Sequence, residues 1–424
     1  MAELGVLAGM FVLYALVSRR LTRTVVTAPM AFVSAGLILG VTGVVDFGFG
    51  SDEGAFEFAL GNEIVLVIAE LALVLVLFTD ASRINLGTLR GNAVLPARLL
   101  GVGMPLSIVL GLVLALPLIT DLEFWEAAVI AAVLAPTDAA LGHAVVSSKR
   151  VPARIRQALN IESGLNDGLA VPLLTIFIAL AAAEEAIEGA GFWIRFALEQ
   201  IGYGAALGVG VGVVGGALIQ RACQRDWVAP LYEQLSVAAL PIVAWAAADA
   251  VGGNGFIAAF VTGLAVSRTV GDLGEKIIDF TEDEGQLLNL SIFFIFGALA
   301  ASVMDELTWQ LVLYGVLSLT VVRMLPVAVA SVGTGLSAPT VAFLGWFGPR
   351  GLASIILALV VFEEEAAIAG AKTIFLAMTI TVLLSVFAHG ISARPLIKLY
   401  GRHVEKMDDE APEMEEVPEV RMRG

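Results

Sequence analysis

Residues 135-APTDAALG-142 place a proline and an aspartate inside an apolar run that extends over about residues 124–146. Proline has no backbone N–H and clashes with the carbonyl one turn earlier, so a helix formed by this run should open locally. Residues 347-FGPRGLAS-354 repeat the pattern, with a proline beside an arginine, inside a second apolar run over about 338–362. The two segments predict two helices that are each interrupted near the middle.

The composition of the chain favours an integral membrane protein. Of the 424 residues, 58% are hydrophobic and 15% are charged, whereas soluble domains carry about a quarter charged residues. At about 20 residues per crossing, the chain is long enough for a dozen or more spans. Residues 1–18 are apolar and their arginines follow them, which indicates a first span with its N-terminus outside rather than a cleaved signal peptide.

Thirteen apolar runs are long enough to be spans. They are at about 3–18, 27–46, 64–80, 93–119, 124–146, 154–183, 193–221, 231–251, 254–268, 287–304, 309–333, 338–362 and 371–391. The eighth and ninth runs are divided at 252-GGNG-255, which is compatible with either a tight turn or a kink. Residues 401–424 are acidic and contain two prolines, so we expect a short, disordered cytoplasmic tail.

The charge pattern tests this topology independently. With the N-terminus outside, 20 of the 24 lysines and arginines fall on the cytoplasmic side, where the positive-inside rule expects them. Of the other four, Arg195 and Lys372 fall outside, and Arg323 and Arg350 lie within spans. The acidic loops at 52–57, 184–188 and 363–365 fall on the outer side. The sequence therefore predicts a multi-pass protein of the cell membrane with an external N-terminus and a cytoplasmic C-terminus.

The two interrupted spans occupy corresponding places. They are the fifth and the twelfth spans, and they become counterparts when spans one to six are paired with spans eight to thirteen. Because the offset between paired spans is seven, an odd number, the two halves run through the membrane in opposite directions. Inverted repeats with matched broken helices are typical of secondary transporters that bind their ion near the membrane midplane. We therefore expect an all-α membrane domain over 1–400, with repeat one at about 3–183, a linker helix at about 193–221 and repeat two at about 231–391. Two unrelated proline kinks are the alternative.

The sixth span, which contains 160-NIESGLNDGLAVP-172, carries the polar side chains expected of an ion site. Glu162, Ser163, Asn166 and Asp167 share one helix face. Asp167 follows the cytoplasmic Arg154 by about 20 Å of helix, which places it near the midplane. Oxygen ligands for an alkali cation are available from Asp167, from Ser163 and from carbonyls freed near Thr137. The alternative is that these residues only form hydrogen bonds between helices.

One carboxylate that holds either a proton or a sodium ion is the minimal requirement for exchange. Asp167 can take both roles. Glu162 lies too close to remain charged beside it without a partner, and Arg323, buried in the eleventh span, is the partner we expect. Asp138 and Arg350 stand beside the two breaks with opposite charges, where helix ends of opposite polarity are exposed. Both are therefore candidate site residues.

These residues resemble a known family. The run 162-ESGLND-167 is similar to the ESxxND pattern of the NhaP/NHE-type sodium/proton antiporters, APTD resembles their TDP motif, and GPRG resembles their GxRG motif. The resemblance covers about residues 5–400. It implies the NhaA/NhaP-like antiporter fold and a homodimer in which a core domain moves against a dimer domain. The chain departs from the pattern at Ala139, where the family has proline, and Pro136 can supply the break instead.

The resemblance also implies roles for single residues. Asp167 would be the carrier of both proton and cation, and Ser163, Thr137 and Glu162 would complete or support the sodium site. Asn166 resembles the structural asparagine beside the carrier. Arg323 resembles the arginine that pairs with the motif glutamate, and Arg350 the arginine of GxRG.

The sequence predicts a sodium/proton antiporter, active also with lithium, that serves pH and sodium homeostasis and is not an enzyme. Since Asn166 cannot ionise, a single carboxylate changes occupancy and exchange should be electroneutral, 1:1. A potassium/proton antiporter and a non-transporting sensor on the same fold remain open. No polar stripe indicates a channel, and no nucleophile–base set indicates an enzyme. One cysteine, three scattered histidines and a net charge of −16 predict no cofactor and no nucleic-acid partner.

Overall fold

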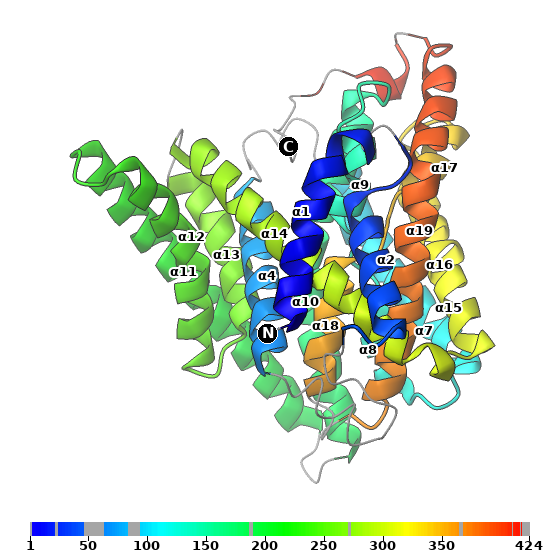
Figure 1. The fold of residues 1–424 in the computed structure, drawn as a ribbon, viewed down its shortest axis with the longest axis horizontal. Helices are drawn as coiled ribbons and strands as arrows, with labels where there is room; N and C mark the ends of the chain where they lie inside the picture. Colours follow the sequence, from blue (N-terminus) through cyan, green and yellow to red (C-terminus); the bar gives the residue numbers. More distant parts are fainter. Residues whose placement is uncertain are drawn as a thin grey trace.

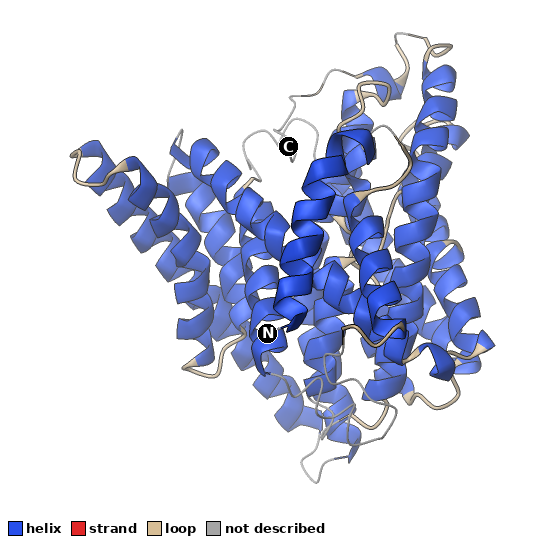
Figure 2. Ribbon diagram, in the orientation of Figure 1, coloured by secondary structure: helices blue, strands red, loops and turns tan. Residues whose placement is uncertain are grey.

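The computed structural model describes residues 2–21, 24–45, 63–83, 94–185, 190–269, 273–363, 368–408, 410–415 and 417. Within these ranges all regular structure is helical (Figure 2). Seven described helices are long and apolar enough to cross a membrane, and four shorter apolar helices accompany them. The predicted all-α membrane fold is confirmed. The acidic loop 52–57 lies outside the described residues, as do 186–188 and 364–365 of the other two acidic loops.

The helices follow the predicted spans closely (Figure 1). The first half contains α1 (Ala2–Leu21), α2 (Ala28–Val41), α4 (Glu63–Ser82), α6 (Val94–Arg98), α7 (Met104–Leu118), α8 (Phe124–Val133), α9 (Ala139–Val146) and α10 (Ala153–Glu185). The second half contains α11 (Ala190–Gln224), α12 (Pro230–Asp249), α13 (Gly255–Thr269), α14 (Leu273–Ser302), α15 (Trp309–Leu319), α16 (Val321–Ala330), α17 (Ala338–Trp346), α18 (Leu352–Glu363) and α19 (Ala371–Val404).

Both predicted interruptions are present. The fifth span is divided into α8 and α9, and the twelfth into α17 and α18. The eighth and ninth spans are joined by a true turn, because Gly252 adopts a φ of +76° between α12 and α13. Two irregularities were not predicted. A π-helical turn at Leu99–Gly103 joins α6 to α7, and Thr320, with φ −110° and ψ −87°, separates α15 from α16.

The helices pack into two groups. The outer bundle contains α1, α2, α4 and α11 to α14, and the crossing bundle contains α6 to α10 and α15 to α19. In Figure 1, α11, α12 and α13 stand at the left edge, far from α15, α16, α17 and α19 on the right. Within the outer bundle, α2 and α14 approach so closely that a Cβ at Gly36 would overlap the Phe294 carbonyl, and one at Gly297 would overlap the Val33 carbonyl. Glycine pairs of this kind permit tight packing of membrane helices.

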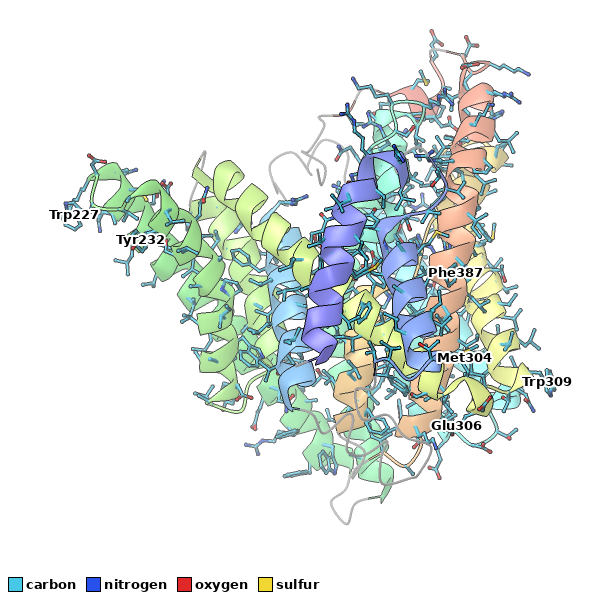
Figure 3. The ribbon with its side chains drawn as sticks, viewed as in Figure 1. Trp227, Tyr232, Met304, Glu306, Trp309 and Phe387 are labelled. Atoms are coloured by element: carbon cyan, nitrogen blue, oxygen red, sulfur yellow. The ribbon has the colours of Figure 1, made fainter. Side chains whose placement is uncertain are left out.

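Large aromatic side chains are exposed at helix ends. Trp227 and Tyr232 lie at the tip of the α11–α12 hairpin, and Trp309 lies at the start of α15 (Figure 3). Trp227 is 71% exposed and Trp309 is 68% exposed. Tryptophan and tyrosine are enriched where a membrane protein meets the lipid–water interface, and their exposure here fits that environment.

The C-terminal part differs from the sequence prediction in two ways. The last span was expected to end at residue 391, but α19 continues to Val404 in spite of the internal Pro395. The tail was expected to be disordered, but its described residues form a short 3-10 turn, Pro412–Met414, that lies against the rest of the protein. Glu413 is only 2% exposed. Specific polar contacts hold residues 410–415 although this segment contains few apolar residues, and the expected disorder of the tail as a whole stays a prediction.

Candidate functional site

Asp138 joins the two broken helices where they cross. Its Oδ1 accepts a hydrogen bond from Leu141 N at 2.9 Å, and its Oδ2 accepts one from Leu352 N at 2.7 Å. These N–H groups belong to the first turns of α9 and α18, so one carboxylate caps the positive ends of both helices. The Asp138 N–H in turn donates to the Pro349 carbonyl at 2.7 Å. Gly351 is required here, because a Cβ at this position would overlap the Asp138 carboxylate.

Arg350 binds carbonyls at the C-terminal ends of α8 and α17, whose polarity is opposite to that of the helix ends capped by Asp138. The side chain is fully buried, and its Nη1 donates to the carbonyls of Pro136 at 3.3 Å and Gly348 at 3.2 Å. These carbonyls follow the ends of α8 and α17, where the helix dipoles are negative. Asp138 and Arg350 thus neutralise helix ends of opposite polarity. The structure confirms the sequence expectation that these two charges meet opposite dipole ends.

His389, which the sequence analysis did not single out as a site residue, attaches the break between α17 and α18 to α19. The two ring nitrogens of His389 lie 2.8 Å from the Trp346 carbonyl and 2.9 Å from the Ser385 carbonyl. The Ser385 hydroxyl also accepts a hydrogen bond from Arg350 N at 2.7 Å. His389 is 1% exposed. The segment between Trp346 and Arg350 is therefore held at both ends by α19, and a lone histidine in an apolar run gives little sign of such a contact.

The polar face of α10 packs against the first break. Asn166 Nδ2 donates to Thr137 Oγ1 at 2.6 Å, and Thr137 Oγ1 lies 3.0 Å from Ser163 Oγ. Thr137 is 1% exposed, Ser163 8%, Asn166 2% and Asp167 6%. The side-chain oxygen of Asn166 is buried without a hydrogen-bond partner. The structure therefore brings Thr137, Ser163 and Asn166 together, with Asp167 buried next to Asn166 in the same helix.

Glu162 and Arg323 form the predicted ion pair. Arg323 Nη1 donates to Glu162 Oε1, and Arg323 Nη2 donates to Oε2 at 2.8 Å. The side chains are 2% and 4% exposed. A buried bidentate pair of this kind satisfies both carboxylate oxygens. Each carboxylate oxygen of Glu162 therefore accepts one hydrogen bond from Arg323, and the guanidinium compensates its charge, while the expected place of Glu162 in the sodium site stays a prediction.

Asp80 is a second residue that sequence reasoning missed. It lies in the last turn of α4 and is 5% exposed. It packs against Gly164 of α10, where an added Cβ would lie 3.7 Å from the Asp80 Cβ and 3.8 Å from its carbonyl oxygen. An intramembrane acid is expensive and usually functional. The signal in the sequence was an aspartate at the end of an otherwise apolar span, in 77-LFTDAS-82.

The chemistry of the cluster fits an alkali cation better than a transition metal. In the part of the chain that the structure describes, no group of three or more His, Cys, Asp or Glu side chains could hold a metal ion. The buried groups around Thr137 are instead hydroxyl, amide and carboxylate oxygens, which suit hard cations.

Comparison with known proteins identifies the family of the chain. A family model described as "Sodium/hydrogen exchanger, transmembrane" matches residues 7–399. The chain belongs to this sodium/hydrogen exchanger family. It is 25% identical over 406 residues to the K(+)/H(+) antiporter NhaP2 of Shewanella sp. (strain ANA-3) and 26% identical over 400 residues to the K(+)/H(+) antiporter NhaP of Alkalimonas amylolytica. Each match covers 93% of this chain but only 66% of the relative.

A solved structure has the same fold. The sodium proton antiporter MjNhaP1 of Methanocaldococcus jannaschii, at pH 8, aligns with a TM-score of 0.73 at 20% identity and covers 93% of this chain and 98% of its own. At this identity the likeness establishes the fold alone. The predicted antiporter fold, with inverted repeats and two broken crossing helices, is thereby confirmed.

Proposed function

We propose that this exchanger-family chain is a secondary active antiporter that exchanges sodium, and also lithium, for protons. The observation that carries the proposal is the buried cluster of Thr137, Ser163 and Asn166 beside Asp167 at the crossing of the two broken helices. Asp167 takes either the cation or the proton. Thr137 and Ser163 supply hydroxyl oxygens, and Asn166 holds α10 against the first break.

The supporting charges keep the site in place. Glu162 and Arg323 neutralise each other, and Asp138 and Arg350 compensate the four helix ends at the crossing. We propose that the crossing bundle moves against the outer bundle to expose Asp167 alternately to the two sides, as expected of broken-helix transporters. In this proposal repeat one covers about 3–183, α11 is the linker helix predicted at about 193–221, and repeat two covers about 231–391.

Potassium is the second candidate substrate. The two curated relatives are named K(+)/H(+) antiporters, whereas the solved structure is named a sodium proton antiporter. Hydroxyl and carboxylate oxygens serve either ion, so the ligand types do not decide between them. Our proposal of sodium rests on the motif resemblance of 162-ESGLND-167.

We propose a homodimer, as the family resemblance implies, that lies in the cell membrane. We also propose an external N-terminus and a cytoplasmic C-terminus, on the strength of the distribution of lysine and arginine. Its role would be pH and sodium homeostasis, without a cofactor. The test is to load proteoliposomes with a pH-sensitive dye and to add sodium, lithium and potassium in turn. Sodium- and lithium-driven proton release without a potassium response is expected. A response to potassium alone would favour the second candidate, and no response to any cation would refute antiport.

A further inference from the structure

A small cavity lies beside Ser163, on the face of α10 that also carries Asp167. It gives the centre of a water molecule about 10 Å³ to occupy, and a space of about 10–15 Å³ in this measure holds one water. Its walls come from α9, from α10 and from the segment that joins α17 to α18. Among the described residues that line it, Asn160 and Ser163 are those with polar side chains. The cavity therefore offers room for one water molecule and two side chains that can bind it.

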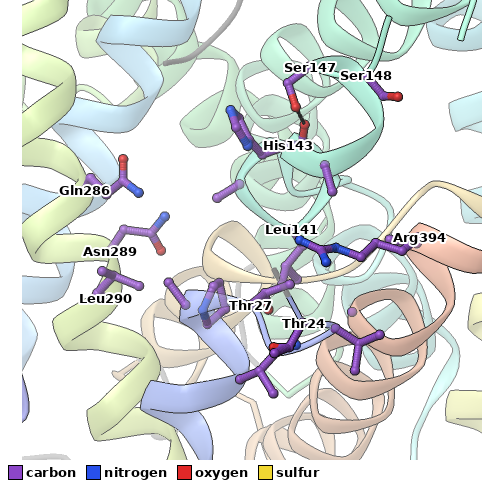
Figure 4. Close-up of a pocket in the computed structure, with 18 of the residues that line it drawn as sticks. Thr24, Thr27, Leu141, His143, Ser147, Ser148, Gln286, Asn289, Leu290 and Arg394 are labelled. Atoms are coloured by element: carbon purple, nitrogen blue, oxygen red, sulfur yellow. Dashed lines mark hydrogen bonds between the residues drawn. The ribbon is translucent and has the colours of Figure 1, made fainter. Parts of the chain in front are cut away.

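The helix α9 stands between this small cavity and a much larger one. The larger cavity, of about 770 Å³, lies against another face of α9, which lines it through residues such as Leu141 and His143 (Figure 4). Gly142 and Val146 of α9 line the small cavity instead. The larger cavity has room for many water molecules, whereas the small one has room for a single molecule beside the hydroxyl cluster.

Both polar side chains of the small cavity have hydrogen-bonding capacity left. Among the described residues, Ser163 Oγ has one hydrogen-bond partner, Thr137 Oγ1 at 3.0 Å. It does not use the usual partner of a helical serine, the carbonyl four residues earlier, which belongs to Leu159. Asn160 is half-buried, and its side chain makes no hydrogen bond to a described residue. A hydroxyl and an amide can each donate and accept, so both can bind a water molecule in the cavity.

The direction of the bond between Ser163 and Thr137 determines whether this cluster can bind a cation. Thr137 Oγ1 already accepts a hydrogen bond from Asn166 Nδ2. If Ser163 also donated to Thr137, both lone pairs of Thr137 Oγ1 would be occupied and neither could face an ion. If Thr137 donates to Ser163 instead, one lone pair stays open on each hydroxyl oxygen. The proton of Ser163 then needs another acceptor, which a water molecule in the cavity can provide.

We propose that the cavity holds one ordered water molecule, which accepts a hydrogen bond from Ser163 Oγ and donates one to Asn160 Oδ1. This water turns the Ser163 proton away from Thr137 and leaves the two hydroxyl oxygens open to the cation. Asn160 is therefore a positioning residue, which acts on the site through the water and does not touch the ion. The effect on transport rests on the proposed antiport function, whereas the water site itself does not.

Threonine and valine at position 160 provide a matched pair, because they have nearly the same shape and differ in one hydroxyl group. Asn160→Val removes the partner of the water and should raise the KM for the transported cation about fivefold, the equivalent of one hydrogen bond of about 1 kcal/mol. Its kcat and melting temperature should stay close to those of the wild type. Asn160→Thr should recover most of the lost affinity. The measurement is proton release against cation concentration in proteoliposomes, with the cation that the wild type exchanges.

Thr175→Val is the control on the same helix. Thr175 donates to the Val171 carbonyl at 2.9 Å and accepts from Asn254 Nδ2 at 3.2 Å, and it lies about 18 Å further along α10 than Ser163. Loss of its hydroxyl should leave the KM unchanged. An unchanged KM in Asn160→Val would overturn the positioning role. Equal increases in Asn160→Val and Asn160→Thr, or in Asn160→Val and Thr175→Val, would overturn it as well.

A structure of the full chain, at a resolution that shows ordered water, tests the site without transport. We expect density for one water molecule within hydrogen-bond distance of Ser163 Oγ and the Asn160 side chain in the wild type and a loss of this density in Asn160→Val. A wild-type cavity without this density overturns the inference. A wild type that exchanges no cation refutes the proposed function instead, and the density still decides whether the water site exists.

Discussion

Glu162 and Arg323 are 161 positions apart in the chain and meet as a bidentate ion pair on the polar face of α10 that also carries Asp167. In the proposed mechanism, this pair keeps Glu162 from exchanging a proton for a cation. It also means that a second negative charge does not compete with Asp167 for the ion. The proposed mechanism depends on this separation of roles between two carboxylates five residues apart.

The first prediction concerns the stability of this pair. Removing one partner leaves the other charge buried without compensation. Glu162→Gln and Arg323→Met should therefore each lower the free energy of unfolding by about 3–5 kcal/mol. The double variant should lose less than the sum of the two single losses, because no charge is then left unpaired. Denaturant or thermal unfolding in detergent measures the stability of the wild type, the two single variants and the double variant. Strict additivity would contradict a direct interaction.

The second prediction concerns Asp167. Asn at this position keeps the shape of the side chain but cannot bind a proton or carry a negative charge, so Asp167→Asn should abolish cation-driven proton movement in proteoliposomes. Its melting temperature should stay close to that of the wild type. Asp305→Asn, which changes an exposed acid outside the site, is the control and should retain exchange. Full exchange by Asp167→Asn would refute the mechanism.

The third prediction concerns the double cap formed by Asp138. Asn can still accept one of the two hydrogen bonds, but it brings no charge to the N-termini of α9 and α18. Each charge–helix interaction is worth up to about 2 kcal/mol in partly buried sites, so Asp138→Asn should destabilise by about 2 kcal/mol and reduce the exchange rate. Asp121→Asn, at an exposed acid, provides the comparison for unfolding in detergent. An unchanged unfolding curve for Asp138→Asn would argue that the crossing does not need the charge.

Much of this site was predictable because charges in a membrane obey strong constraints. A buried arginine must find a carboxylate, and few candidates existed within the spans, so the partner of Arg323 followed from the sequence. The breaks followed from Pro136 and Pro349, since proline removes a helix hydrogen bond. The opposite charges at Asp138 and Arg350 then matched the exposed helix ends.

Other features could not be read from the sequence, because they depend on which surfaces face each other. His389 is a lone histidine in an apolar run and Asp80 lies at the end of one, and only the packing of α19 and α10 shows what they contact. The break at Thr320 has no proline or glycine at the site itself. The contacts of residues 410–415 could not be read from the sequence for a related reason: low hydrophobicity predicts disorder, but Glu413 and Glu415 have specific partners in the structure.

The fourth prediction concerns that tail. Glu413 accepts hydrogen bonds from Ser337 N and Thr340 Oγ1, both at 2.8 Å, at the start of α17. Burial alone raises the pKa of this carboxyl, but the hydrogen bonds from Ser337 and Thr340 outweigh it and hold the pKa below its ordinary value. A lowered pKa means that docking is stabilised above the ordinary glutamate pKa and is lost as the pH falls through the lowered one.

A spin label at Met414 should therefore be immobile near neutral pH and become mobile in acid. Glu413→Gln should remove this pH dependence and release the segment already at neutral pH. Arg154 provides a second contact, since it forms a 2.8 Å ion pair with Glu415, so Arg154→Gln should also loosen the label, and more at low salt than at high salt. A label that is equally mobile in wild type and Glu413→Gln at every pH would contradict docking through Glu413.

The last prediction is the stoichiometry of exchange. Asn166 cannot ionise and Glu162 is bound to Arg323, so one carboxylate changes occupancy in each cycle. The empty site then carries one negative charge, which one proton or one sodium ion neutralises. The loaded carrier has the same charge in both directions, so no net charge crosses the membrane in a complete turnover. A membrane potential does work only on net charge, about 2.3 kcal/mol per charge per 100 mV, and should therefore not drive exchange.

The experiment imposes a potassium–valinomycin potential on proteoliposomes that have no pH or sodium gradient, after potassium itself has been shown not to be transported. We expect no sustained sodium accumulation with either sign of the potential. Accumulation that reverses with the potential would mean that a second proton moves in each cycle. The buried acids Asp80 and Asp138 would then be the first residues to replace with asparagine, because Glu162 is held by Arg323. Loss of the voltage dependence in one of these variants would identify the second proton carrier.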